Sequence, residues 1–261
     1  MIIPKKVASI EIKKFFRKKI FKNLFYQSTM KNKDLLDLKS KKLYKPDLED
    51  LYFLHQLIIK NKRTTVLEFG SGWSSLVMAH ALSKLKLKYS LKQQRRQNPF
   101  ELFIIENEKK FLELTKKKIS QNKTKFQIKN KINYFFSEAR MTNYAGNICT
   151  EYKQLPHCNP DFIYLDGPDQ YSVKGSKNNI STAHKDFMPM VCDILKIENF
   201  LQPGTIISCD GRKANARFLK NNFKRKWDYY ELSYIDQTIF HLNEKPLGPI
   251  NSKLIKFYKS K

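Results

Sequence analysis

The sequence predicts an α/β protein built on a doubly wound, mostly parallel sheet, and three observations lead to this prediction. From residue 47 onward, short apolar runs alternate with helical patterns, which is typical of parallel strands joined by crossover helices. A glycine turn, Gly70-Ser71-Gly72, lies between the first such strand and the first helix after it. The last two strands are separated only by Ile235 and Asp236, which favours an antiparallel hairpin. Together they indicate a Rossmann-like sheet of seven strands that follows a basic helical extension.

Residues 1–45 form this N-terminal extension, the first of three predicted segments. Between residues 7 and 25, apolar side chains recur at helical spacing among lysines, so we expect a basic amphipathic helix. Two interpretations stay open. In the first, the helix contacts a membrane surface or a partner. In the second, which we favour, its apolar face covers the rest of the protein.

Residues 46–245 form the α/β region. Its predicted strands are short and apolar, and residues 161–165 are continuously apolar, as in a buried parallel strand. The strands are expected at 64–69, 102–106, 126–136, 161–165, 204–209, 227–234 and 237–243. The helices alternate with them, the first capped by Asp47 and the fourth disturbed by Pro189. They are expected at 48–60, 74–85, 109–120, 182–199 and 214–223. Residues 84–98 are predicted to be an exposed basic insertion, 137–160 a loop, and 246–261 a basic C-terminal tail.

Composition narrows the class of protein. The chain has 261 residues, 41% of them hydrophobic, which is too apolar for a disordered chain, and it lacks an uncharged apolar run of the ~20 residues that span a bilayer. Its formal charge is +26. Only eight of the 50 basic residues are arginine, the side chain that nucleic-acid sites favour, so a nucleic-acid partner is the less favoured interpretation. An AT-rich genome would explain the lysine excess equally well.

The four cysteines form no CxxC pair, and no secretory signal opens the sequence. We therefore expect reduced thiols and a cytoplasmic protein, peripheral at a membrane if the N-terminal helix binds lipid. Cys149, His157 and Cys158 lie close together in the sequence, but a fourth ligand at zinc-finger spacing is missing, so they are interpreted as loop residues.

The strongest functional signal is the strand, glycine turn and helix around Gly70 and Gly72. Glycines let the backbone approach a ligand there, and the helix N-terminus offers free N–H groups. Glu68, two residues before Gly70, can accept hydrogen bonds from a cationic amino-acid group. Glu106, at the end of the second strand, can bind both hydroxyls of a ribose. Glu106 lies further from the glycines than the acidic residue of nicotinamide dinucleotide sites, although the basic insertion would also explain that spacing.

At these positions the sequence resembles the class I S-adenosylmethionine-dependent methyltransferases. The resemblance covers residues 47–243 and rests on Glu68-x-Gly70-x-Gly72, on Glu106, on Asp166-Gly167-Pro168 and on the closing hairpin. It implies that Glu68, Gly70 and Gly72 line the methionine end, that Glu106 binds the ribose and that residues 137–139 flank the adenine. The usual third glycine is replaced by Ser74. The implied cofactor site comprises Glu68, Gly70, Ser71, Gly72, Ser74, Glu106, Asn107, Ser137, Glu138, Ala139 and Asp166.

Catalysis is expected at the carboxyl ends of the fourth and fifth strands, beside the cofactor crevice. Transfer to a hydroxyl needs a general base or a metal ion that lowers the pKa of that hydroxyl. Asp166 and Asp210 would hold Mg²⁺ as in similar catechol-type and sugar O-methyltransferases, although Gly211 replaces the asparagine usual there. Without a metal, Asp166 or His184 would be the base, and residues 172–179 a lid. The candidate contacts to the substrate are Asp169, Tyr171, Lys174, Arg212 and Asn215.

The methyl acceptor is narrowed by absent motifs. Asp166-Gly167-Pro168 differs from the Asn/Asp-Pro-Pro-aromatic motif of enzymes that methylate base amino groups, and a Pro-Cys nucleophile is missing. We therefore expect O-methylation of a small molecule, sugar or glycan. The alternatives are an RNA-modifying methyltransferase, a Rossmann-like binding or scaffold protein without turnover, and a dinucleotide-dependent oxidoreductase.

Overall fold

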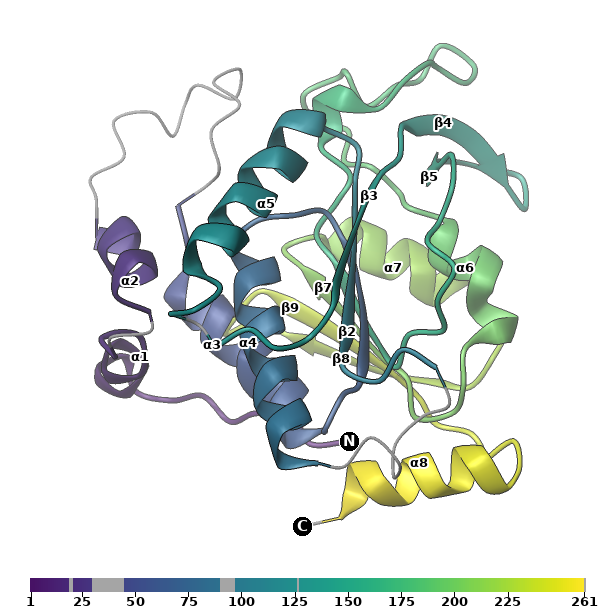
Figure 1. The fold of residues 1–261 in the computed structure, drawn as a ribbon. Helices are drawn as coiled ribbons and strands as arrows, with labels where there is room; N and C mark the ends of the chain where they lie inside the picture. Colours follow the sequence, from purple (N-terminus) through teal and green to yellow (C-terminus); the bar gives the residue numbers. More distant parts are fainter. Residues whose placement is uncertain (19–20, 30–44, 90–96, 126, 261) are drawn as a thin grey trace.

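The computed structural model describes residues 1–18, 21–29, 45–89, 97–125 and 127–260 (Figure 1). Its centre is a seven-stranded sheet with the order β3-β2-β1-β6-β7-β9-β8. The first five of these strands run parallel, and β9 joins β7 antiparallel before pairing with β8 as a hairpin. Their bounds are β1 Thr65–Phe69, β2 Glu101–Glu106, β3 Ile132–Phe136, β6 Phe162–Leu165, β7 Ile206–Asp210, β8 Trp227–Leu232 and β9 Gln237–Leu242. The predicted fold class is therefore confirmed.

Helices cover both faces of the sheet, because alternate residues of each buried strand point to opposite sides. On β1, Val66 packs into one apolar cluster and Leu67 into the other. The first cluster is covered by α3 (Leu48–Lys60), α4 (Trp73–Lys88) and α5 (Lys109–Asn122). The second is covered by α6 (Asp193–Ile197) and α7 (Lys213–Asn222). Asp47 caps α3 as expected, accepting hydrogen bonds from the N–H groups of Glu49 and Asp50.

The N-terminal extension forms two short helices, α1 (Ser9–Phe16) and α2 (Lys22–Thr29), where the sequence predicted one. Phe16, Phe21 and Leu24 are fully buried in the cluster that α3 and α4 share. The favoured interpretation of the extension therefore holds: its apolar face covers the molecule. Residues 30–44, at the end of the extension, and residues 90–96, in the middle of the expected basic insertion, lie outside the described residues. The start of that insertion is not exposed irregular chain as expected, because residues 84–88 continue α4 and Leu85 is buried.

Several further expectations about elements were wrong. Residues 137–160 are not a loop, because β4 (Ala139–Tyr144) and β5 (Asn147–Tyr152) form a separate antiparallel hairpin. Residues 182–199 are not one helix: only α6 and the short 3-10 helix η4 (Glu198–Phe200) form, and Pro189 lies in the irregular chain before them. The C-terminal residues expected as a tail include a helix, α8 (Pro249–Lys259), while the division into three segments stays a prediction.

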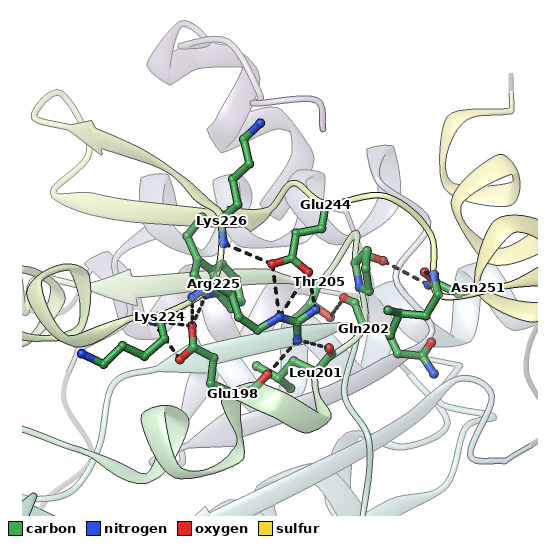
Figure 2. A network of polar contacts seen from close by, with 12 residues as sticks. Glu198, Leu201, Gln202, Thr205, Lys224, Arg225, Lys226, Glu244 and Asn251 are labelled. Atoms are coloured by element: carbon green, nitrogen blue, oxygen red, sulfur yellow. Dashed lines mark hydrogen bonds and ion pairs between the residues drawn. The ribbon is translucent and has the colours of Figure 1, made fainter. Parts of the chain in front are cut away.

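A network of hydrogen bonds and ion pairs joins η4 to two other segments, the residues that precede β8 and the residue Glu244 after β9 (Figure 2). The Arg225 guanidinium donates to the Glu244 carboxylate and to the backbone oxygens of Glu198 and Leu201. The Glu198 carboxylate accepts from the Trp227 indole and from backbone N–H groups of the preceding turn. The network lies away from the sheet's carboxyl ends and is structural. Within the described residues, no helix combines the length and the apolar character needed to cross a bilayer.

Candidate active site

A pocket of about 590 Å³ opens at the carboxyl ends of the parallel strands. Its floor comes from the turns that follow β1, β6 and β7 and from the end of β2, because parallel strands bring these turns to one edge of the sheet. One wall is the N-terminal turn of α3, and another comes from residues 185–189. Of the predicted site residues it gathers the following: Gly70, Ser71, Gly72, Ser74, Glu106, Asp166, Asp169, Tyr171, Asp210 and Arg212.

The two glycines of the turn after β1 have different surroundings. Gly70 has a φ of +103°, and a Cβ added to it would lie 3.0 Å from the backbone nitrogen of Gly167. A Cβ on Gly167 would in turn lie 2.6 Å from the Gly70 nitrogen. Both residues are therefore required by the contact between their two turns. Gly72 lines the pocket, and a Cβ there would meet nothing within 4 Å, so its surface is open to a ligand.

Glu106 lines the pocket as expected, and its carboxylate is held from three directions. One oxygen accepts from the backbone N–H groups of Asn107 and Glu108, at 2.8 and 3.0 Å, and the other from the Ser71 hydroxyl at 2.8 Å. Burial raises the pKa of Glu106 to about 7, although these hydrogen bonds favour the ionised form. The arrangement fixes an acceptor group in the pocket.

Glu68 lies behind the pocket rather than in its lining. Its side chain is fully buried, and its two oxygens accept from the hydroxyls of Ser74 and Ser75 at 2.5 and 2.6 Å. Burial raises its pKa to about 8. In this structure Glu68 therefore organises the first turn of α4, and its carboxylate is not presented to a ligand.

Asp210, at the end of β7, has hydrogen bonds to both of its carboxylate oxygens. Its two oxygens accept from the Tyr164 hydroxyl at 2.5 Å and from the Gln237 amide at 2.6 Å. Gln237 lies directly opposite Asp210 in the β7–β9 pairing, and the Ser208 hydroxyl donates to the Gln237 carbonyl oxygen. Burial raises the pKa of Asp210. Asp50 also lines the pocket. Burial, with the Asp210 charge second, raises the Asp50 pKa to about 8.

Asp166 follows β6, and its side chain is 48% exposed to the pocket. The surrounding protein limits its solvation, and this raises its pKa to about 7, with the nearby Asp210 charge adding to the effect. Arg212 supports the turn after β6 by donating to the backbone oxygens of Asp166 and Pro168. Its Nε lies 3.9 Å from the nearer Asp166 carboxylate oxygen, so Arg212 moderates the negative charge there.

The expected adenine contacts lie outside the pocket lining. The Ser137 hydroxyl accepts from the backbone N–H of Gln154, Glu138 is exposed and pairs with Lys153, and Ala139 is buried at the start of β4. The missed β4–β5 hairpin explains this, because Ala139 pairs with Tyr152 and the chain that follows β5 donates backbone hydrogen bonds to Glu138 and Ser137. Asn107 is also structural: it exchanges two hydrogen bonds with the backbone of Asp169.

Three further candidates from the sequence are placed elsewhere. His184 is exposed outside the pocket lining, where its ring packs on Phe187. The backbone of Lys174 exchanges hydrogen bonds with β4. Lys174 therefore holds the chain that follows β6 against the β4–β5 hairpin. Asn215 is buried and binds the backbone of Val191.

A metal ion would have few protein ligands here. Asp166 and Asp210 both line the pocket, but Gly211 adds no side chain. Within the part of the chain that the structure describes, no three His, Cys, Asp or Glu side chains gather to hold a metal ion. Cys149 was expected in a loop but lies in β5, whereas His157 and Cys158 lie in the irregular chain that follows it.

Sequence reasoning missed several residues of the pocket. Lys45 precedes α3 and Asp50 lies in its first turn, a segment for which the sequence predicted a capped helix but no site residue. Trp73 and Phe111 add aromatic surface from the first turns of α4 and α5. One sequence feature could have identified Asp50 as a pocket residue. It lies in the first turn of the helix that Asp47 caps, and that turn lies at the carboxyl edge of the sheet.

No family model matches this chain, and no curated protein does. Solved structures resemble it at low identity. An O-methyltransferase from Bacillus cereus in complex with SAH has a TM-score of 0.41 and 11% identity, covering 94% of each chain. The O-methyltransferase TomG from Streptomyces achromogenes in complex with SAM has a TM-score of 0.39 and 12% identity, covering 94% of this chain and 93% of that one. A methyltransferase from Geobacter sulfurreducens has a TM-score of 0.44 and 9% identity, with 76% and 80% covered.

Proposed function

We propose that this protein is an S-adenosylmethionine-dependent methyltransferase that transfers a methyl group to the hydroxyl of a small molecule, sugar or glycan. The observation that carries the proposal is the convergence of three features in one pocket. These are the open glycine turn at Gly72, the fixed carboxylate of Glu106 and the acidic residues that follow β6 and β7.

The residues present fit the methyl donor. Glu106 is held so that it can accept hydrogen bonds from ribose hydroxyls, and Gly72 leaves room for a ligand against the backbone. Trp73 and Phe111 supply aromatic surface that suits a purine. Asp166 supplies negative charge for the cationic end. When bound, S-adenosylmethionine supplies an electrophilic methyl group on its sulfonium.

Asp210 is the residue best placed to take the proton of the acceptor hydroxyl. Tyr164 and Gln237 fix both of its oxygens, so the carboxylate faces the pocket in one orientation. Asp166, with a pKa of about 7, is the second candidate base. We favour direct proton transfer over Mg²⁺, because Asp166 and Asp210 alone would be few ligands for the ion and Gly211 supplies none.

Acceptor binding is assigned to the open side of the pocket. Tyr171 offers a half-exposed ring there, and Asp50 and Asp169 offer carboxylates that can accept hydrogen bonds from hydroxyl groups. These groups suit a polyhydroxylated or phenolic acceptor.

Calorimetric titration with S-adenosylmethionine, S-adenosylhomocysteine and NAD tests the donor without requiring the acceptor. We expect micromolar binding of the first two, about −8 kcal/mol, and none of NAD. Gly72→Val should block binding without strain, because its Cβ points into open space, whereas a substitution at Gly70 would disturb the Gly167 turn. If neither methionine-derived ligand binds, the glycine turn has only a structural role and the proposal is refuted.

Glu106→Ala should weaken binding of both ligands at least about tenfold, because it removes an acceptor of charge-assisted hydrogen bonds. Glu138→Ala is the matched control, since Glu138 is exposed outside the pocket lining. Equal affinities for Glu106→Ala and the control would remove Glu106 from the ligand site.

A further inference from the structure

The outer side of the two N-terminal helices combines positive charge with exposed apolar side chains. Ile10, Lys13, Lys14 and Arg17 are spaced so that they share one side of α1, and Lys22 and Tyr26 share one side of α2. Ile10 and Tyr26 are 67% and 63% exposed. We name these six residues the N-terminal basic face.

The direction of this face is fixed by what the helices bury on the other side. Phe16, Phe21 and Leu24 are fully enclosed in the core cluster beneath, and Phe15 contacts the rings of Tyr52 and His55 on α3. The two helices lie on the outer side of α3 and α4 (Figure 1). The basic face therefore points away from the molecule while its helices are anchored to it.

The described parts of the N-terminal extension carry little negative charge that could balance this face. Within residues 1–18 and 21–29, the only acidic residue is Glu11. None of the four basic residues of the face has an ion pair with a residue that the structure describes. Arg17 lies instead over the Phe25 ring, 5.5 Å from its centroid, which joins the two helices.

This combination matches the surface of an anionic bilayer better than it matches a nucleic acid. Lysine side chains attract anionic lipid headgroups as point charges, and exposed Ile and Tyr side chains can enter the interface between headgroups and acyl chains. An isoleucine gains nothing from a phosphate backbone. Arginine, the side chain suited to bidentate recognition, occurs once in the face.

We propose that the N-terminal basic face docks this protein on an anionic lipid membrane as a peripheral protein. Each Lys or Arg near such a surface strengthens binding by about fivefold, so the face supplies reversible attachment that salt weakens. The inference does not depend on the proposed methyl transfer, because neither lipid binding nor its residues involve the pocket lining.

Cosedimentation of the full chain with lipid vesicles tests this proposal. We expect binding to vesicles of phosphatidylcholine mixed with phosphatidylglycerol, little binding to phosphatidylcholine alone, and release at high salt. The combined variant Lys13→Glu, Lys14→Glu and Arg17→Glu should lose at least about fiftyfold in affinity. The double variant Ile10→Ser and Tyr26→Ser should lose a smaller part of the affinity for vesicles, and salt should not change the size of that loss.

The matched control is Lys253→Glu, Lys256→Glu and Lys259→Glu on α8, which changes the net charge equally. It should keep most of the affinity. An equal loss in both triple variants would overturn the proposal, because attraction would then come from the overall charge of +26. Tighter binding to single-stranded RNA than to the mixed vesicles, abolished by the α1 variant, would also overturn it. Thermal unfolding of each variant verifies that the fold is intact.

Discussion

Glu68 shows how a single buried carboxyl group couples stability to pH. Its folded-state pKa of about 8 lies above the ordinary value of 4.5, because burial penalises the charge. Below pH 4.5 the carboxyl group is protonated in both states and its contribution is fully present. As pH rises toward 8, the unfolded chain releases this proton first, so stability is lost.

Glu68→Gln should therefore flatten the pH dependence of stability. We expect the free energy of unfolding of the variant to exceed that of the wild type by about 1 to 3 kcal/mol at pH 8, and the difference to vanish near pH 4.5. Urea denaturation at pH 4.5, 6 and 8 measures this. If the free energy of unfolding changes with pH equally in the two proteins, burial does not shift the pKa of Glu68.

Asp210 allows a second test at the level of one hydrogen bond. Tyr164 donates to the ionised carboxylate, so Tyr164→Phe should raise the pKa of Asp210 by about one pH unit. Carbon-13 NMR of labelled aspartate carboxyl groups follows this titration, and Gln237→Leu should act in the same direction. Tyr230→Phe, on an exposed position of β8, is the control. An unmoved Asp210 titration would contradict the positioning role of Tyr164.

At this scale the sequence predicts the residues whose role follows from backbone position. Gly72, Glu106 and Asp210 end or follow strands, and parallel strands bring such positions together. It fails where a role depends on side-chain partners. Glu68 turns inward because two serines of α4 bind it, and Asp50 reaches the pocket only because α3 packs with its first turn at the sheet's edge.

Among the elements, α1 contributes to the core although it precedes the α/β region. Phe16→Ala should lower the free energy of unfolding by about 3 to 5 kcal/mol, since it empties a fully buried site. Ile10→Ala, on the exposed side of the same helix, should change it by less than about 0.5 kcal/mol. Urea denaturation compares the two. Similar small losses would show that the helix packs weakly.

The β4–β5 hairpin was missed because its turn lacks the usual residues. Ala145 and Gly146 both have positive φ angles, +49° and +82°, where Asn-Gly or Asp-Gly is the recognised signal. The expected helix at 182–199 failed for the opposite reason. Its apolar spacing suggested a helix, but Pro189 has no backbone N–H, and residues 190–192 exchange backbone hydrogen bonds with Thr150 of β5 instead of forming a helical turn. Pairing with β5 therefore overrode the local helical pattern at residues 190–192.

The whole molecule carries a charge of +26, yet its pocket is acidic. Among the lining residues, Asp47, Asp50, Glu106, Asp166, Asp169 and Asp210 oppose only Lys45, Lys185 and Arg212. Once these carboxyl groups are ionised, the charge of the pocket lining has the opposite sign to the overall charge, and it then favours a cationic ligand over a neutral one.

This contrast predicts how donor and product compete. S-adenosylmethionine carries one more positive charge than S-adenosylhomocysteine. Glu106 and Asp166, each with a pKa of about 7, lose protons between pH 6 and 8. The preference for the donor should therefore grow several-fold over this range and shrink in high salt. Calorimetry at pH 6, 7 and 8 measures both affinities. A constant ratio would mean that neither carboxyl group senses the sulfonium.

The pairing of β1 with β6 also determines how early during synthesis of the chain the pocket can form. Phe69 ends one strand and Phe162 begins the other, so about ninety residues must leave the ribosome between them. At ordinary rates of synthesis this delay is on the order of ten seconds. Until then the glycine turn lacks its Gly167 partner, and the N-terminal aromatic side chains lack part of their core. A small molecule that binds the pocket can stabilise the completed protein, but it arrives too late to guide the nascent one.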